Sequence, residues 1–188
     1  MTHLLNICRL ALDGIDNGQR IYTEERLLEA LNHIVRPNMK DEEIRDSIIQ
    51  VALELTSDME PRWQNAAARL YVFKLYGKIR KNREITNDEN IYGDLYGFIN
   101  QLTEKGLYGK YILENYTREE ILELENEIKP ERDFLFTYSG INLLAKRYLI
   151  QDFDRSTLEL PQQMFMGIAM HLAIPEKKEV RVLWAKRF

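Results

Sequence analysis

The chain has 188 residues, of which 45% are hydrophobic and 30% are charged. This is the composition of a globular protein, not of a disordered or membrane-embedded one, and no apolar run reaches the ~18 residues that a transmembrane helix needs. The formal net charge of −4 comes without a basic region, which argues against nucleic-acid binding. With no signal-peptide pattern at the N-terminus, we expect a cytoplasmic protein of one or two domains and no membrane partner.

Apolar residues recur at helical spacing along the first part of the chain. The pattern and its capping residues predict four helices, at roughly residues 2–14, 23–37, 41–55 and 61–83. The fourth ends in the basic segment KIRKNR, residues 78–83. Cations at this position interact favourably with the negative end of the helix dipole. The alternative is that they contact phosphate.

A polar linker is expected at residues 84–89, and further helical patterns follow it. The first of these helices ends at Gly106. Thr117 and Glu120 then form a capping-box pattern at the start of a helix that Pro130 ends. The best strand pattern predicts one short β-hairpin around the turn QDFDRS, pairing residues 148–150 (Tyr148 to Ile150) with residues 158–160 (Leu158 to Leu160).

The segment PQQMFMGIAMHLAI, residues 161–174, is almost wholly apolar. It predicts a buried helix whose core residues are Met164, Phe165, Ile168 and Leu172. A last amphipathic segment follows at residues 179–188. The patterns together predict an all-α fold, a helical bundle of about eight helices in two packed sub-domains with at most one short β-hairpin.

Few residues in this sequence suggest chemistry. The histidines at positions 3, 33 and 171 (His3, His33 and His171) are scattered, so we expect structural or exposed roles and no metal site. Glu29 and His33 form Glu-x-x-x-His and not the Glu-x-x-His box of di-iron bundles. The single cysteine, Cys8, lies on an apolar helix face and is expected to be a small buried hydrophobe. With no P-loop and no Gly-x-Gly-x-x-Gly motif, we predict no catalytic residue.

A longer resemblance runs through the second half of the chain. Residues 106–150, 158–173 and 184–188 (which end in WAKRF) resemble the N-terminal helical region of the large subunit of class I ribonucleotide reductase. The order of a Tyr, a Thr-x-x-Glu box, Pro-Glu-Arg-Asp, Phe-Leu-Phe and Pro-Gln-Gln-Met-Phe carries this resemblance. Residues 66–79, AAARLYVFKLYGKI, resemble the last helix of the ATP-cone, the regulatory domain that precedes this region in the family. We therefore assign residues 1–83 to a partial ATP-cone and residues 84–188 to the all-alpha domain.

The resemblance implies a helical layer that packs against the outside of an α/β barrel. In this layer PERD makes a corner between two helices, and Phe134 and Phe136 turn inward. The family's barrel holds its radical cysteine and its redox-active cysteine pair, so these 188 residues would not be catalytic alone, and no cofactor is expected in them. The implied enzyme reduces ribonucleoside diphosphates for DNA precursor synthesis, and the implied partners are the barrel region and a radical-generating small subunit. A homodimer through exposed apolar faces is also considered.

The sequence departs from the ATP-cone pattern at the positions that would meet nucleotide. The basic hairpin that opens family cones has no counterpart here, an expected threonine is Asp41, and an expected lysine is Gly77. Lys40 and Lys78 are the remaining, weak nucleotide-binding candidates. Because Asp41 would repel a triphosphate, we predict no ATP binding. The alternative functions are a stand-alone helical interaction module without catalysis and, less favoured, a free nucleotide sensor.

Overall fold

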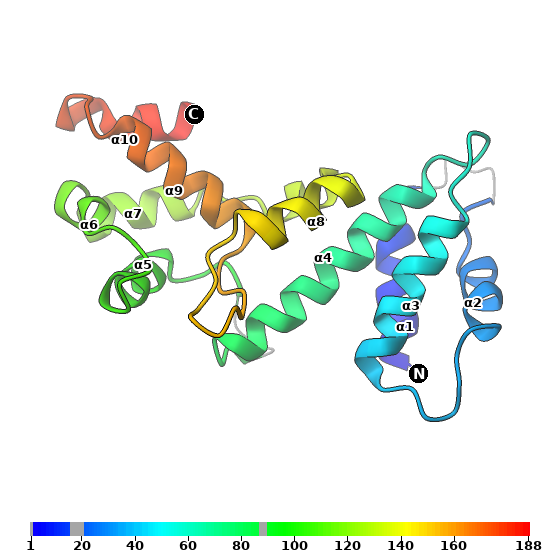
Figure 1. Ribbon diagram of the computed structural model, residues 1–188. Coiled ribbons are helices and arrows are strands. Elements are labelled where there is room, and N and C mark those ends of the chain that lie inside the picture. The colour runs from blue at the N-terminus through cyan, green and yellow to red at the C-terminus, as the bar shows by residue number, and fades with distance from the viewer. Residues whose placement is uncertain (1, 16–20, 87–89) are drawn as a thin grey trace. The chain divides into compact units, whose positions relative to one another are not determined.

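The structure is a computed structural model that describes residues 2–15, 21–86 and 90–188. The helices in these ranges are α1 (Thr2–Leu12), α2 (Glu24–Asn32), α3 (Asp41–Glu54), α4 (Trp63–Asn82), α5 (Leu95–Glu104), α6 (Tyr111–Asn115), α7 (Arg118–Glu125), the 3-10 helix η1 (Pro130–Leu135), α8 (Tyr138–Arg147), α9 (Pro161–Ala173) and α10 (Lys178–Arg187) (Figure 1). The same ranges contain no β-strand, so the all-α prediction is confirmed. The helix count exceeds about eight because α6 and η1 are too short to show a helical period in the sequence.

The chain divides into two compact units. One unit is Met1–Leu75 with Asp133–Leu144, and the other is Tyr76–Arg132 with Ala145–Phe188. The division therefore falls inside α4, inside η1 and inside α8. The assignment of residues 1–83 to a partial ATP-cone and of residues 84–188 to an all-alpha domain stays a prediction.

Trp63, at the start of α4, is at the centre of the core of the first unit. Its side chain is fully buried, its ring centre lies 5.4 Å from that of Tyr22, and its Nε1–H donates to Glu60 Oε2 at 3.1 Å. Glu60 also pairs with Arg26 of α2 at 2.7 Å. The indole thus buries its large apolar surface while its polar edge stays hydrogen-bonded. Around it pack the buried faces of α1, α2 and α3, which include Cys8, Leu27, Leu31, Ile48 and Ala52.

The corner PERD folds as η1, and the aromatic residues after it meet the same unit. The Phe134 ring centre lies 5.3 Å from that of Phe73 on α4 and 5.9 Å from the guanidinium carbon of Arg69. Phe134 and Phe136 are partly buried, whereas Leu135 between them is exposed. The predicted inward turn of the two phenylalanines is therefore confirmed.

In the second unit, the start of α7 is set by the capping residues recognised in the sequence. Thr117 Oγ1 accepts from the Glu120 backbone N–H at 3.2 Å, and Glu120 Oε2 accepts from the Thr117 N–H at 2.7 Å. The predicted capping box is thus present. α10 packs on α9 and on α7, and the buried side chains of the unit include Ile79, Leu95, Phe98, Leu102, Ile112, Ile121 and Leu124.

The predicted hairpin is reduced to a single antiparallel bridge between Gln151 and Thr157 in the described residues. The Ile150 carbonyl accepts from the Leu158 N–H at 2.9 Å, which is within the predicted pairing. The Ile150 N–H, however, donates to the side chain of Glu159, at 3.0 Å. No ladder extends from the bridge because a carboxylate takes the place of a backbone acceptor.

The predicted core face of α9 is wrong. Phe165, Ile168 and Leu172 are 45%, 48% and 52% exposed, and Met164 is only partly buried. The helix instead buries its small-residue face, on which Gly167 permits close approach, since a Cβ there would lie 2.3 Å from the Tyr108 hydroxyl oxygen. The buried residues of α9 are Pro161, Gln163, Gly167, Ala169, Met170 and Ala173.

Candidate functional site

The two lysines predicted as weak nucleotide ligands are exposed. Lys40 is the N-cap residue of α3, and its backbone N–H donates to Glu43 Oε2 at 2.7 Å. Three acidic residues, Asp41, Glu42 and Glu43, fill the first turn of that helix. Lys78 lies on α4, in the other compact unit. The α3 start, where an anion would otherwise be favoured, is thus negatively charged.

The cysteine and the described histidines that the sequence singled out contact other parts of the protein or lie at its surface. Cys8 is fully buried, and desolvation together with Glu24 raises the pKa of its thiol to about 11. His33 is exposed at the end of α2, and the ring of His171 meets that of Tyr111 edge-on at 4.9 Å. The prediction for His3 lies outside the described side chains. Among the described residues, no three His, Cys, Asp or Glu side chains are placed to share a metal ion.

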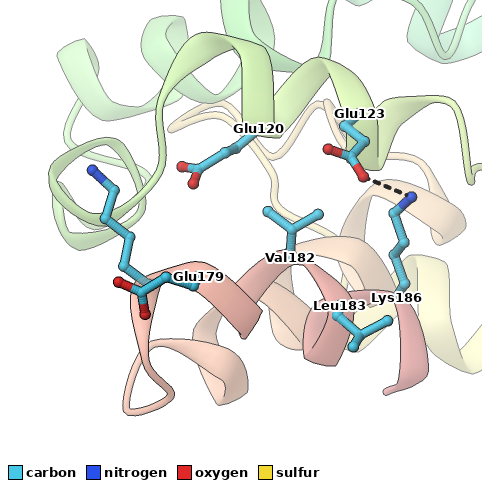
Figure 2. Close-up of a pocket in the computed structure, with 7 residues that line it drawn as sticks. Glu120, Glu123, Glu179, Val182, Leu183 and Lys186 are labelled. Carbon is cyan, nitrogen blue, oxygen red and sulfur yellow. Dashed lines mark ion pairs between the residues drawn. The ribbon is translucent and has the colours of Figure 1, made fainter.

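A groove of about 500 Å³ lies between α7 and α10 (Figure 2). The Val182 side chain points from α10 towards α7, and the Lys186 ammonium closes one end by pairing with Glu123 at 3.0 Å. Lys186 also pairs with Glu127 at 2.8 Å and thereby lowers the pKa of that carboxyl. The lining consists of Glu120, Glu123, Lys178, Glu179, Val182, Leu183 and Lys186. It offers ion pairing and aliphatic contact, which support the association of α7 with α10.

A buried polar cluster lies at the start of α9. The guanidinium group of Arg83 is 4.2 Å from the centre of the Phe98 ring and donates to Gln163 Oε1 at 3.3 Å. Desolvation lowers the pKa of Arg83 to about 10. Gln163 Oε1 also accepts from the Leu160 N–H at 3.1 Å, while its amide nitrogen is buried without a hydrogen-bond partner. The cluster fixes the first turn of α9.

Glu159 precedes this turn and is 3% exposed. Desolvation raises the pKa of its carboxyl to about 7, and the hydrogen bond from Ile150 partly opposes that rise. Neither Glu159 nor the role of Arg83 was predicted from the sequence. Both side chains are of charged types that are expected on the surface, and only the fold determines that Glu159 is buried and Arg83 partly buried.

The apolar stripe, defined as Phe165, Ile168 and Leu172, is the other feature of α9. These residues are spaced by three and four positions and therefore lie on one helix face. The whole segment of residues 161–174 contains no Asp, Glu, Lys or Arg. An uncharged face with three large exposed apolar side chains is typical of a surface that another part of a protein covers. No described helix is long and apolar enough to cross a membrane.

Comparisons with a protein-family model and with individual proteins both lead to ribonucleotide reductase. Residues 134–188 match the family described as ribonucleotide reductase, all-alpha domain. The chain is 40% identical over 141 residues to the ribonucleoside-diphosphate reductase subunit alpha of Treponema pallidum, which is 75% of this chain and 16% of that protein. It is 32% identical over 179 residues to that of Helicobacter pylori, covering 95% of this chain and 21% of the relative. With subunit alpha of reductase 1 of Escherichia coli it shares 31% identity over 153 residues, 80% of this chain and 19% of the relative.

The resemblance predicted from the sequence is therefore confirmed. The chain is similar over most of its length to ribonucleoside-diphosphate reductase alpha subunits, and it spans between 16% and 21% of the length of these three relatives. In sequence it corresponds to one part of such a subunit.

Proposed function

We propose that the chain acts as the N-terminal helical portion of a ribonucleoside-diphosphate reductase large subunit. The observation that carries the proposal is its similarity to the alpha subunits, which reaches 95% of this chain. On this proposal the whole protein reduces ribonucleoside diphosphates to their deoxy forms for DNA precursor synthesis. The rest of the large subunit supplies the reacting groups, and a radical-generating small subunit is its partner.

Within that protein the helical portion serves as a scaffold. Its one cysteine is buried in α1 with a pKa of about 11, so a thiolate there is disfavoured at neutral pH. Its partly buried Arg83 contacts Phe98 of α5 and Gln163 of α9 and so holds helices together. These features support a packing role better than a catalytic one.

The apolar stripe of α9 is the surface through which we propose that the scaffold docks onto the remainder of the large subunit. Complete transfer of a side chain of this size from water to an apolar interior is favourable by roughly 1.5–3 kcal/mol, and because these three are about half exposed, docking would gain roughly half of that for each. The stripe carries no charge that a partner would have to desolvate. A second copy of the chain would cover the same stripe, so a homodimer is the competing arrangement.

The test is reconstitution of a divided reductase. The Treponema pallidum alpha subunit would be produced without the residues that this chain matches and mixed with this chain and a small subunit. Reduction of a ribonucleoside diphosphate should reappear on mixing. The double variant Phe165→Glu/Leu172→Glu should abolish the recovery, because it places two charges in the docking surface.

Met59→Glu is the matched control. Met59 is 88% exposed and lies in the other compact unit, so this variant should reconstitute as well as the unaltered chain. A different outcome is that the chain fails to bind the truncated subunit and associates with itself, and that the stripe variant abolishes this self-association. This result would establish the stand-alone interaction module. Recovery of activity by the stripe variant would overturn the docking surface and leave the similarity as the support for the proposal.

A further inference from the structure

The turn between α8 and α9, residues 150–159, is closed by a buried carboxylate. Glu159 Oε2 accepts the Ile150 backbone N–H at 3.0 Å, and the Ile150 carbonyl accepts from the Leu158 N–H at 2.9 Å. The same carbonyl also accepts from the Glu159 N–H at 3.3 Å, so the first and last residues of the turn are joined by one side-chain and one backbone hydrogen bond. Because Glu159 is 3% exposed, water cannot readily replace it at the Ile150 N–H.

The middle of the turn is held by contacts that do not involve Glu159. The Lys105 ammonium pairs with Asp152 at 2.6 Å, and the Asn82 side-chain amide donates to the Thr157 carbonyl at 2.9 Å. Among the described residues, Lys105 reaches this turn and is already paired with Asp152, and Arg155, which lies in the turn itself, is exposed to solvent. Neither of these two cations forms a described ion pair with Glu159.

The groups that border Glu159 are neutral or already engaged. On the segment before α6, the Tyr108 phenol is close enough that Glu159 contributes to the rise of its pKa, together with desolvation. At the end of α4, the Arg83 guanidinium is held by Phe98 and Gln163. A charge on Glu159 therefore has one backbone N–H to stabilise it and no paired cation, a costly state for a buried carboxylate.

We propose that Glu159 makes the turn 150–159 a pH-sensitive latch, in which the neutral carboxyl keeps the turn closed and its ionisation loosens it. In the closed turn, burial raises the pKa of Glu159 to about 7, whereas a solvated glutamate has a pKa of about 4.3. Between these two values the open form has lost a proton that the closed form keeps. Opening therefore becomes about tenfold more frequent per pH unit in this window and levels off above it.

The latch acts directly on α9. Leu160 and Pro161 follow Glu159 immediately, and α9 begins at Pro161. Loosening of the turn frees the first turn of the helix that carries the apolar stripe. We infer that acid conditions hold α9 more firmly and that neutral or alkaline conditions make its start more mobile, whether or not the stripe docks as proposed above.

Hydrogen exchange of the Ile150 amide measures the latch on the intact chain. After correction for the pH dependence of intrinsic exchange, its protection should fall roughly tenfold per pH unit from about pH 5 to about pH 6.5. In Glu159→Gln, whose amide oxygen can still accept the Ile150 N–H, protection should be independent of pH. Glu114→Gln, an exposed change on α6, is the control and should keep the slope of the unaltered chain.

A direct titration keeps the proposal testable if Glu159→Gln does not fold. The side-chain carboxyl carbon of Glu159, followed by NMR in the unaltered chain, should titrate near pH 7. A midpoint near the ordinary glutamate value, or an Ile150 protection that does not change with pH, would overturn the latch.

Discussion

The guanidinium carbon of Arg83 lies 4.2 Å from the centre of the Phe98 ring, the shortest such contact in the described chain. Phe98 is buried at 4% exposure and Arg83 is partly buried, so the contact is partly shielded from water and ions. A cation over an aromatic face contributes up to about 2 kcal/mol when it is desolvated. The contact joins the C-terminal end of α4 to α5 within one compact unit.

Arg83→Ala should therefore lower the free energy of unfolding by about 2 kcal/mol, through loss of this contact and of the packing of the arginine stem. Urea denaturation followed by circular dichroism measures the change. The matched control is Arg187→Ala, because the guanidinium carbon of exposed Arg187 lies 5.3 Å from the Trp184 ring centre. That variant should stay within about 0.5 kcal/mol of the unaltered chain, and equal losses from the two would contradict the argument.

The two faces of α9 should respond differently to truncation. Met170 is fully buried, so Met170→Ala should cost about 2–5 kcal/mol. Phe165 is 45% exposed, so Phe165→Ala should cost less than about 1 kcal/mol. The comparison is made by denaturation at a concentration where the chain is monomeric. A larger loss for Phe165→Ala would mean that the stripe is buried in solution, as it would be in a dimer.

The Tyr116 hydroxyl donates to the Met170 backbone carbonyl at 2.7 Å in the protein interior. Tyr116→Phe keeps the ring and leaves that carbonyl without its side-chain donor, which should cost about 1–3 kcal/mol. Tyr148→Phe is the control, because Tyr148 is 63% exposed and its hydroxyl can bind water instead. Denaturation midpoints that shift equally for the two variants would count against a structural role for the Tyr116 hydrogen bond.

What could be predicted from the sequence was local. The Thr117–Glu120 capping box depends on residues three positions apart, whereas the inward turn of Phe134 was implied by the resemblance to the reductase family. The buried face of α9 could not be predicted, because every face of PQQMFMGIAMHLAI is apolar and no period distinguishes them. Side-chain size separates them in the structure, since the face that holds Gly167, Ala169 and Ala173 packs inward.

The roles of Arg83 and Glu159 could not be predicted for a different reason. Arg83 is the last residue of KIRKNR. The presence of cations in this segment was already explained by their favourable interaction with the negative end of the helix dipole. The ring contact of Arg83 needs Phe98, fifteen positions away across a linker, and such a partner cannot be recognised without the fold. Glu159 likewise accepts from Ile150 only because the turn closes, and the spacing of its neighbours resembles that of a strand.

Cys8 should be inert in the folded chain. Its pKa of about 11 leaves only about one thiol in a thousand ionised at pH 8, and the thiolate is the reactive form. A thiol-reactive dye should therefore modify it at the rate of unfolding. In denaturant, one equivalent should react at once, since the sequence has a single cysteine. Rapid modification of the folded chain would show that α1 opens to solvent.

The last prediction concerns nucleotide binding, for which Lys40 and Lys78 were the weak candidates. A triphosphate at the start of α3 would meet the carboxylates of Asp41, Glu42 and Glu43, and Glu43 already accepts the Lys40 N–H. Two like charges ~4 Å apart at an effective dielectric constant near 20 repel by about 4 kcal/mol, which corresponds to roughly a thousandfold in affinity. Isothermal titration with ATP and with dATP should therefore detect no micromolar site, and Lys78→Ala should leave that result unchanged. A micromolar site for either nucleotide would contradict the prediction, and Asp41→Thr would then show whether α3 holds it, since removal of one carboxylate should tighten binding there.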